Sequence, residues 1–80
     1  MKKSVKFIPH AIERMKKRGI TDKMVLDALK FSEKIDAGRG GRKIAQKMFG
    51  DKLLRVIYEE KDDAVQVITA YLTSKVEKYR

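Results

Sequence analysis

The sequence predicts an α+β domain: an N-terminal αα-hairpin packed on one face of a three- to four-stranded antiparallel β-meander, followed by a short C-terminal helix. Three observations predict this class. Apolar residues recur at helical spacing as far as residue 31, and they then alternate, between turn residues, as far as residue 72. Ser74 and Glu77 have the spacing of a capping box, which predicts the last helix. With 80 residues the chain makes a single domain, 1–80.

The αα-hairpin is expected at residues 9–18 and 22–31, joined by a tight turn. Pro9 suits the first helical position, and Gly19 suits the left-handed position just past the helix end. Thr21 is expected to cap the second helix, with Asp22 in its first turn. Both helices carry an apolar face, made in the first by Ile8, Ala11, Ile12 and Met15 and in the second by Met24, Val25, Ala28, Leu29 and Phe31.

The strands are expected at residues 42–49, 52–59 and 64–72, with an irregular strand at 32–37 and a tail at 2–7 that forms at most a fragment of strand. A two-residue turn at Gly50-Asp51 pairs Ala45 with Val56. A second turn, centred on Lys61-Asp62, pairs Val56 with Val67 and Leu54 with Thr69.

This register sorts the strand residues onto two faces. We expect the helices on the cleaner apolar face, which holds Ala45, Phe49, Leu54, Val56, Tyr58, Val65 and Val67. The other face mixes apolar and polar residues and is a candidate docking surface; it holds Ile44, Gln46, Met48, Leu53, Arg55, Ile57, Gln66 and Ile68.

The net charge is +9, and its distribution along the chain is uneven. Residues 1–31 carry nine basic and three acidic side chains, residues 32–50 carry five and two, and residues 51–80 carry six of each. Such a one-sided surplus indicates a polyanionic partner, most often nucleic acid, although a lysine-rich surface also serves solubility.

The composition excludes several kinds of site. The chain has no cysteine and one histidine, so neither a disulfide framework nor a metal site is expected, and no cofactor is expected either. Residues 38–41 lack the Lys-Ser/Thr that completes a phosphate-binding P-loop. No apolar run has the length that spans a bilayer, and no signal-like segment follows the basic N-terminus, so we expect a cytoplasmic protein without membrane contact.

The candidate chemistry lies in a row of three side chains on the first helix. His10, Arg14 and Arg18 are spaced four residues apart, which places them side by side on successive turns. Metal-free RNA cleavage needs a group that moves a proton and cations that stabilise the phosphorane-like transition state. Histidine titrates near neutrality, and the planar fork of arginine grips phosphate oxygens. We call His10, Arg14 and Arg18 the cationic row.

Other side chains could complete such a site. Hydroxyl groups that could assist catalysis or stack a base belong to Tyr58, Thr69, Tyr71, Thr73 and Tyr79. The basic side chains expected to hold an RNA backbone are Lys17, Arg42, Lys43, Lys47 and Arg55. The structural alternatives are that the histidine bonds to backbone, that the two arginines pair with carboxylates or cover apolar surface, and that the tyrosines are half-buried strand residues.

The order His-Ala-x-x-Arg-Met-x-x-Arg-Gly-Ile, at residues 10–20, resembles a group of small bacterial and archaeal domains of unknown function related to RelE-like ribonuclease toxins. The strand sequences at residues 53–58 and 67–71 are similar to that group's strand pair, and the end of the chain is similar to that of BrnT toxins. The resemblance covers about residues 7–79. It implies a RelE-like fold with signature positions at His10, Arg14, Arg18, Gly19, Tyr58 and Thr69.

The resemblance also implies a toxin-type endoribonuclease that acts on RNA, with ribosome-associated mRNA as one candidate substrate, and that has a cognate antitoxin. The catalytic set would be His10, Arg14, Arg18, Thr69 and Tyr58. Two alternatives stay open: a non-catalytic module that binds RNA or DNA, and a protein-interaction domain.

Overall fold

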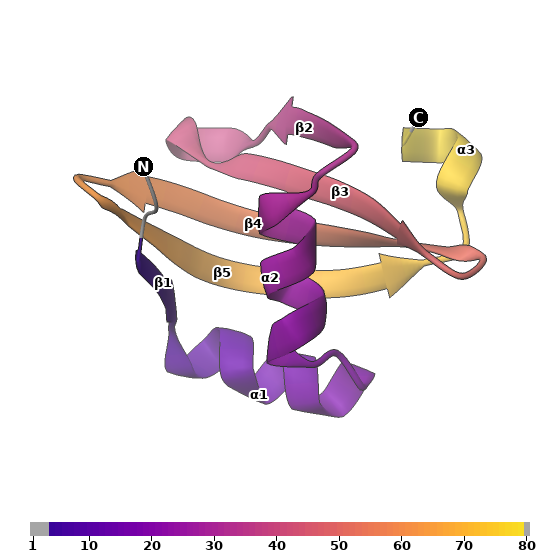
Figure 1. The fold of residues 1–80 in the computed structure, drawn as a ribbon, viewed down its shortest axis with the longest axis horizontal. Coiled ribbons are helices and arrows are strands. Elements are labelled where there is room, and N and C mark those ends of the chain that lie inside the picture. Colours follow the sequence, from indigo (N-terminus) through magenta and orange to yellow (C-terminus); the bar gives the residue numbers. More distant parts are fainter. Residues whose placement is uncertain (1–3, 80) are drawn as a thin grey trace.

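The computed structural model describes residues 4–79 and shows a five-stranded sheet with helices (Figure 1). The strand order is β1-β5-β4-β3-β2, in which β1 runs parallel to β5 and the other neighbours are antiparallel. Along the chain the elements are β1 (Ser4–Phe7), α1 (Pro9–Arg18), α2 (Asp22–Lys30), β2 (Lys34–Ala37), a 3-10 turn (Arg39–Gly41), β3 (Lys43–Phe49), β4 (Lys52–Lys61), β5 (Ala64–Thr73) and α3 (Val76–Tyr79).

The α+β class is confirmed, but the purely antiparallel meander of three to four strands is wrong. The difference is β1, whose four residues pair in parallel with the start of β5. So short a segment carries too little alternation to identify a strand, and a parallel partner distant in sequence leaves no turn signal. Residues 2 and 3 of the expected tail lie outside the described part of the chain.

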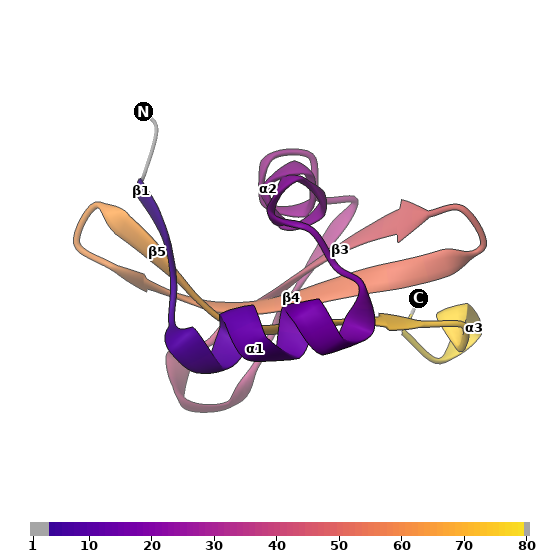
Figure 2. The ribbon, with the colours of Figure 1, turned by 90° about the horizontal axis from the view of Figure 1, so that it is seen from below.

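Helices α1 and α2 do not form the expected hairpin of two antiparallel helices. They are joined by a tight turn but run across each other, α1 along β5 and α2 over β3 and β4 (Figures 1 and 2). The caps are as expected: Thr21 Oγ1 accepts a hydrogen bond from the Met24 backbone amide at 3.2 Å, and Gly19 ends α1 at φ +67°. Each helix therefore covers different strands on one face of the sheet.

The core lies between this sheet face and the two helices. It contains every residue that the sequence placed on the apolar face, with Phe49 at its periphery, so that assignment is confirmed. The buried cluster consists of Ala11, Met15, Ile20, Val25, Ala28, Ala45, Leu54, Val56, Tyr58, Val65, Val67 and Ala70.

The register of β3 with β4 is confirmed, whereas that of β4 with β5 differs from the expectation. Gly50-Asp51 forms the two-residue turn and pairs Ala45 with Val56. The next turn is centred on Asp62-Asp63, one residue later than expected, and an irregularity follows at Ile57/Tyr58. Together these pair Val56 with Ala70 and Leu54 with Leu72. A bulge adds one residue to one strand, so periodicity alone could not place the second half of β5.

The short C-terminal helix, α3, is confirmed, with a different residue at its start. The hydroxyl of Thr73, rather than that of Ser74, accepts a hydrogen bond from a backbone amide. The donor is Lys75 N, at 3.1 Å. Within residues 4–79, no helix is both long and apolar enough to cross a bilayer.

Candidate nucleic-acid interface

Helix α1 presents the cationic row on its exposed side. Ala11 and Met15 of the same helix are buried against the sheet, which fixes the rotation of α1 about its axis. His10, Arg14 and Arg18 are consequently exposed along the border of the buried stripe. The row lies on one continuous helix, so its three side chains keep a fixed order and spacing.

His10 and Arg14 contact each other directly. Arg14 Nε donates a hydrogen bond to His10 Nε2 at 2.7 Å. An Nε2 that accepts a hydrogen bond carries no proton, so the imidazole in this arrangement is the neutral tautomer with its proton on Nδ1. The Arg14 NH1 and NH2 groups are not used in this bond, and they form the part of the fork suited to a phosphate oxygen.

Arg18 joins the row to the sheet. Its NH1 donates to the Ala70 carbonyl oxygen at 2.9 Å and lies 3.5 Å from Thr69 Oγ1. Because β1 pairs with β5 only as far as Val67, the Ala70 carbonyl lies on a stretch of strand edge that α1 covers. This contact brings the predicted residue Thr69 next to the row.

No carboxylate within residues 4–79 forms an ion pair with Arg14 or Arg18. The nearest acidic residue on α1, Glu13, pairs with Lys17 at 3.6 Å. The row, Glu13 and Lys17 together line a shallow surface hollow of about 290 Å³. The two guanidinium groups therefore keep their charge available for an anion that enters this hollow.

The other predicted site residues lie elsewhere. Tyr58 is 6% exposed, belongs to the core and does not line the hollow on α1. Arg42 pairs with Glu59 at 2.9 Å, and Lys43 pairs with Glu60, which raises the Lys43 pKa through that hydrogen bond. Lys47 lies over the Phe49 ring, with 4.8 Å from Nζ to the ring centroid. The structure thus gathers His10, Arg14, Lys17, Arg18 and Thr69, and separates Tyr58, Arg42, Lys43, Lys47 and Arg55 from them.

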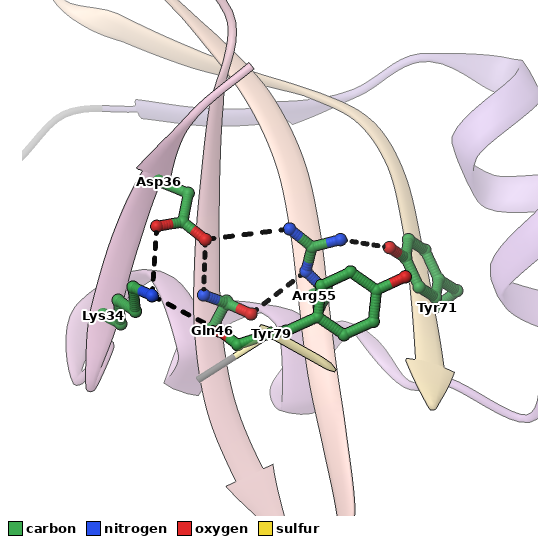
Figure 3. Close-up of polar contacts among 6 residues, drawn as sticks. All are labelled: Lys34, Asp36, Gln46, Arg55, Tyr71 and Tyr79. Carbon is green, nitrogen blue, oxygen red and sulfur yellow. Dashed lines mark hydrogen bonds and ion pairs between the residues drawn. The ribbon is translucent and has the colours of Figure 1, made fainter. Parts of the chain in front are cut away.

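Arg55 belongs to a second polar cluster on the sheet face opposite α1 and α2 (Figure 3). It is 8% exposed, and its partners come from four elements. We call this group the Arg55 cluster; it consists of Lys34, Asp36, Gln46, Arg55, Tyr71 and Tyr79.

Sequence reasoning missed most of the Arg55 cluster. The β3–β4 register placed Gln46 beside Arg55 on the mixed face, but no signal in the sequence brings Tyr79 back over that face. Burial is the main cause that raises the pKa of Tyr71, and a hydrogen bond with the Tyr71 hydroxyl is the main cause that lowers the pKa of Tyr79. The pKa of each phenol therefore depends on the other.

Among residues 4–79, His, Asp and Glu side chains form no group of three or more that could hold a metal ion. The chemistry available at the cationic row is that of one imidazole and two guanidinium groups.

Comparison with known protein families gives a match. The sequence profile of the family described as "Domain of unknown function (DUF4258)" matches residues 7–72. The chain belongs to the DUF4258 family. This confirms the expected membership of a family of small domains of unknown function. No curated protein and no solved structure matches this DUF4258 chain.

Proposed function

We propose that this DUF4258 domain is a metal-independent endoribonuclease whose site is the cationic row of α1. One observation carries the proposal: on an exposed helix edge, the only histidine is followed on successive turns by two guanidinium groups without carboxylate partners in residues 4–79. A phosphodiester supplies the anion that such a pair lacks. The surplus of basic residues in the first half of the chain supports the same substrate class.

The proposed reaction transfers the phosphoryl group of one RNA linkage from the 5′-oxygen to the 2′-oxygen. The 2′-oxygen attacks phosphorus, the bond from phosphorus to the 5′-oxygen breaks, and a 2′,3′-cyclic phosphate and a 5′-hydroxyl result. The 2′-hydroxyl proton passes to His10 Nε2 once substrate replaces the Arg14 Nε–H there, and water protonates the departing oxygen. Arg14, released from His10, and the remaining donors of Arg18 stabilise the charge on the phosphorane-like transition state.

A second candidate function is RNA or DNA binding without cleavage. It is favoured by the hydrogen bond from Arg14 to His10, which occupies the imidazole lone pair that a general base would use. In this alternative the row holds the backbone, and the imidazole only orients Arg14.

The biological setting we propose is a toxin–antitoxin pair, with cellular RNA, including ribosome-associated mRNA, as the substrate and a cognate antitoxin as the protein partner. The resemblance of residues 10–20 to domains related to RelE-like toxins supports this setting. Growth arrest on expression, relieved by His10→Ala with Arg14→Ala or by co-expression of a neighbouring gene, is the expected behaviour.

The biochemical test uses single-stranded RNA with the purified chain in excess chelator. We expect cleavage to cyclic-phosphate ends, and none at a nucleotide that carries a 2′-deoxy substitution. His10→Ala should lower the rate by about 10²–10⁴-fold and Arg14→Ala by about 10²–10³-fold. Arg39→Ala, an exposed arginine outside the row, is the matched control and should cleave normally.

Two outcomes separate the candidates. If RNA binds to the wild type but stays intact, the cleavage proposal is wrong and the binding function takes its place. Equal cleavage by the wild type and the His10→Ala/Arg14→Ala double variant would assign the activity to a contaminant and contradict the proposal.

A further inference from the structure

The guanidinium group of Arg55 has partners along all three of its edges. Nε donates to Gln46 Oε1 at 3.0 Å, NH1 donates to the Tyr71 hydroxyl, and NH2 lies 3.8 Å from Asp36 Oδ2 (Figure 3). Gln46 is itself held by a 2.9 Å hydrogen bond from its Nε2 to Asp36 Oδ2. These contacts hold the plane of the guanidinium in position, and its flat faces remain for a stacking partner.

Tyr79 of α3 occupies one of these faces. The centroid of its ring lies 3.8 Å from Arg55 Cζ, and its backbone carbonyl oxygen accepts a hydrogen bond from Lys34 Nζ at 3.4 Å (Figure 3). Tyr79 thus presents two groups to this surface: an aromatic ring for the cation, and an acceptor oxygen for the ammonium group.

Helix α3 depends on tertiary contacts to keep its fold. It is four residues long, and a helix of one turn has no stability without its tertiary contacts. Glu77 and Lys78 are exposed, whereas Val76 and Tyr79 are half-buried. Displacement of α3 would uncover the Arg55 face and free Lys34 from the Tyr79 carbonyl, while Lys34 would keep its 3.6 Å ion pair with Asp36. Asp36, Gln46 and Tyr71 would still hold the guanidinium.

The space next to Tyr79 already forms a hollow of about 240 Å³. Glu33 and Lys34 contribute polar groups to its wall, and Met48, Leu53 and Val76 contribute apolar ones. A ring that replaced Tyr79 would have this hollow beside it, with hydrogen-bonding groups at its rim.

We propose that the Arg55 cluster is a nucleotide-binding site whose base position is filled by Tyr79 in this structure. A nucleobase stacks on a guanidinium plane, and a phosphate oxygen takes the place of the Tyr79 carbonyl at Lys34. An aromatic residue of a partner protein would supply the ring but not the anion that takes the place of the Tyr79 carbonyl at Lys34. The site lies on the sheet face opposite α1, so it does not depend on cleavage at the cationic row.

The test is a nitrogen–proton NMR titration that follows the Arg55 Nε–Hε resonance. Tyr79→Ala should move this resonance by removing the ring current, and AMP should move it back. We expect AMP to bind Tyr79→Ala about tenfold more tightly than the wild type, since the competing ring is gone. A second titration, with a short single-stranded RNA in place of AMP, shows whether the site binds an RNA strand or only a free nucleotide.

Three further variants test which groups hold the nucleotide. Arg55→Lys on the Tyr79→Ala background keeps the charge but removes the plane. Its AMP affinity, followed by the backbone amide resonances of residues around position 55 because the guanidinium resonance is lost, should fall by at least the tenfold gain. Lys34→Ala on the same background should weaken the binding of AMP but leave the binding of adenosine unchanged. This comparison keeps the test valid if Arg55→Lys does not fold. His10→Ala with Arg14→Ala should leave AMP binding at Arg55 intact, so failure of the ribonuclease proposal would not affect it.

Two results would overturn the proposal. In the first, millimolar AMP and the RNA both leave the Arg55 resonance of Tyr79→Ala unmoved. In the second, all perturbations map to α1.

Discussion

Arg18 and Ala70 connect the last turn of α1 to the covered edge of β5, through a 2.9 Å hydrogen bond from NH1 to the carbonyl oxygen. An edge carbonyl without a strand partner needs water or a side-chain donor, and Arg18 supplies that donor. The same contact fixes the C-terminal end of the row relative to the sheet. Arg18 thus has a structural role through the NH1 donor that binds the Ala70 carbonyl. In the proposed reaction, its remaining donors have a functional role.

We expect Arg18→Ala to lower the free energy of unfolding by about 1 kcal/mol, because the Ala70 carbonyl loses its donor. Lys17→Ala, whose exposed pair with Glu13 contributes little, is the control and should change it by less than about 0.5 kcal/mol. Urea denaturation of both variants measures the difference. Equal stability of the two would mean that water replaces the guanidinium at no cost.

The sequence predicted the parts of the fold that depend on local pattern. Helix caps at Thr21 and Gly19, the turn at Gly50-Asp51 and the apolar sheet face all follow from periodicity and turn chemistry. The parallel pairing of β1 and the bulge in β5 do not, because both arise from contacts that only the folded chain makes.

The candidate site likewise contains contacts that follow from local spacing and contacts that only the folded chain makes. The order of His10, Arg14 and Arg18 on one helix edge follows from helical spacing, and the contact of Arg14 with His10 is its consequence. The proximity of Arg18 to Thr69 spans 51 residues of sequence, and the stacking of Tyr79 on Arg55 depends on the return of α3. Spacing alone could predict neither contact.

Leu54 should dominate the stability of the core. It is fully buried between β3, β5 and the helices, so Leu54→Ala leaves a cavity and should cost about 3 kcal/mol in the free energy of unfolding. Leu26→Ala, at a leucine that is 43% exposed on α2, is the matched control and should cost less than about 1 kcal/mol. A loss of similar size in both, by urea denaturation, would contradict the burial of Leu54.

Gly19 allows the chain to leave α1 in a left-handed conformation. A side chain at this position would meet no atom within 4 Å, so the cost of Gly19→Ala comes from the backbone alone. We expect a loss of about 1 kcal/mol for Gly19→Ala and about half of that for Gly19→Asn, since asparagine tolerates this conformation better. Thermal unfolding of the two variants checks this order; an alanine variant as stable as the wild type would refute it.

The phenols of Tyr71 and Tyr79 should ionise in a fixed order. Burial raises the pKa of Tyr71 above its ordinary value of 10.0, and the hydrogen bond with Tyr71 lowers that of Tyr79 below 10.0. A raised pKa contributes stability that is complete below pH 10.0 and is lost as the pH rises through the folded-state pKa. A lowered pKa contributes stability that is present above pH 10.0 and is lost as the pH falls through the folded-state pKa.

Ultraviolet titration of the phenolates should therefore show Tyr79 ionising first, and Tyr71→Phe should reduce the loss of stability above pH 10.0. Tyr79→Phe should lower the pKa of Tyr71, because its hydrogen bond with Tyr79 helps to raise it. If Tyr71 ionises first in the wild type, the burial of its hydroxyl is not what controls its protonation.

The lysines of α1 should set the salt dependence of RNA binding. Lys17 lines the hollow with the row, and Lys16 is exposed on the same helix, so each can neutralise one phosphate without touching His10. Lys16→Ala with Lys17→Ala should reduce the slope of log affinity against log salt by about 1.4, or roughly 0.7 for each lost phosphate contact on single-stranded RNA.

The matched control for this pair is Lys52→Ala with Lys61→Ala. These two exposed lysines lie in β4, within residues 51–80, whose charges balance, and their removal changes the net charge by the same amount. Fluorescence anisotropy with labelled RNA at several salt concentrations gives both slopes. Equal reductions would indicate that RNA responds to total charge, whereas a reduction confined to the α1 pair would locate the backbone contact along the row.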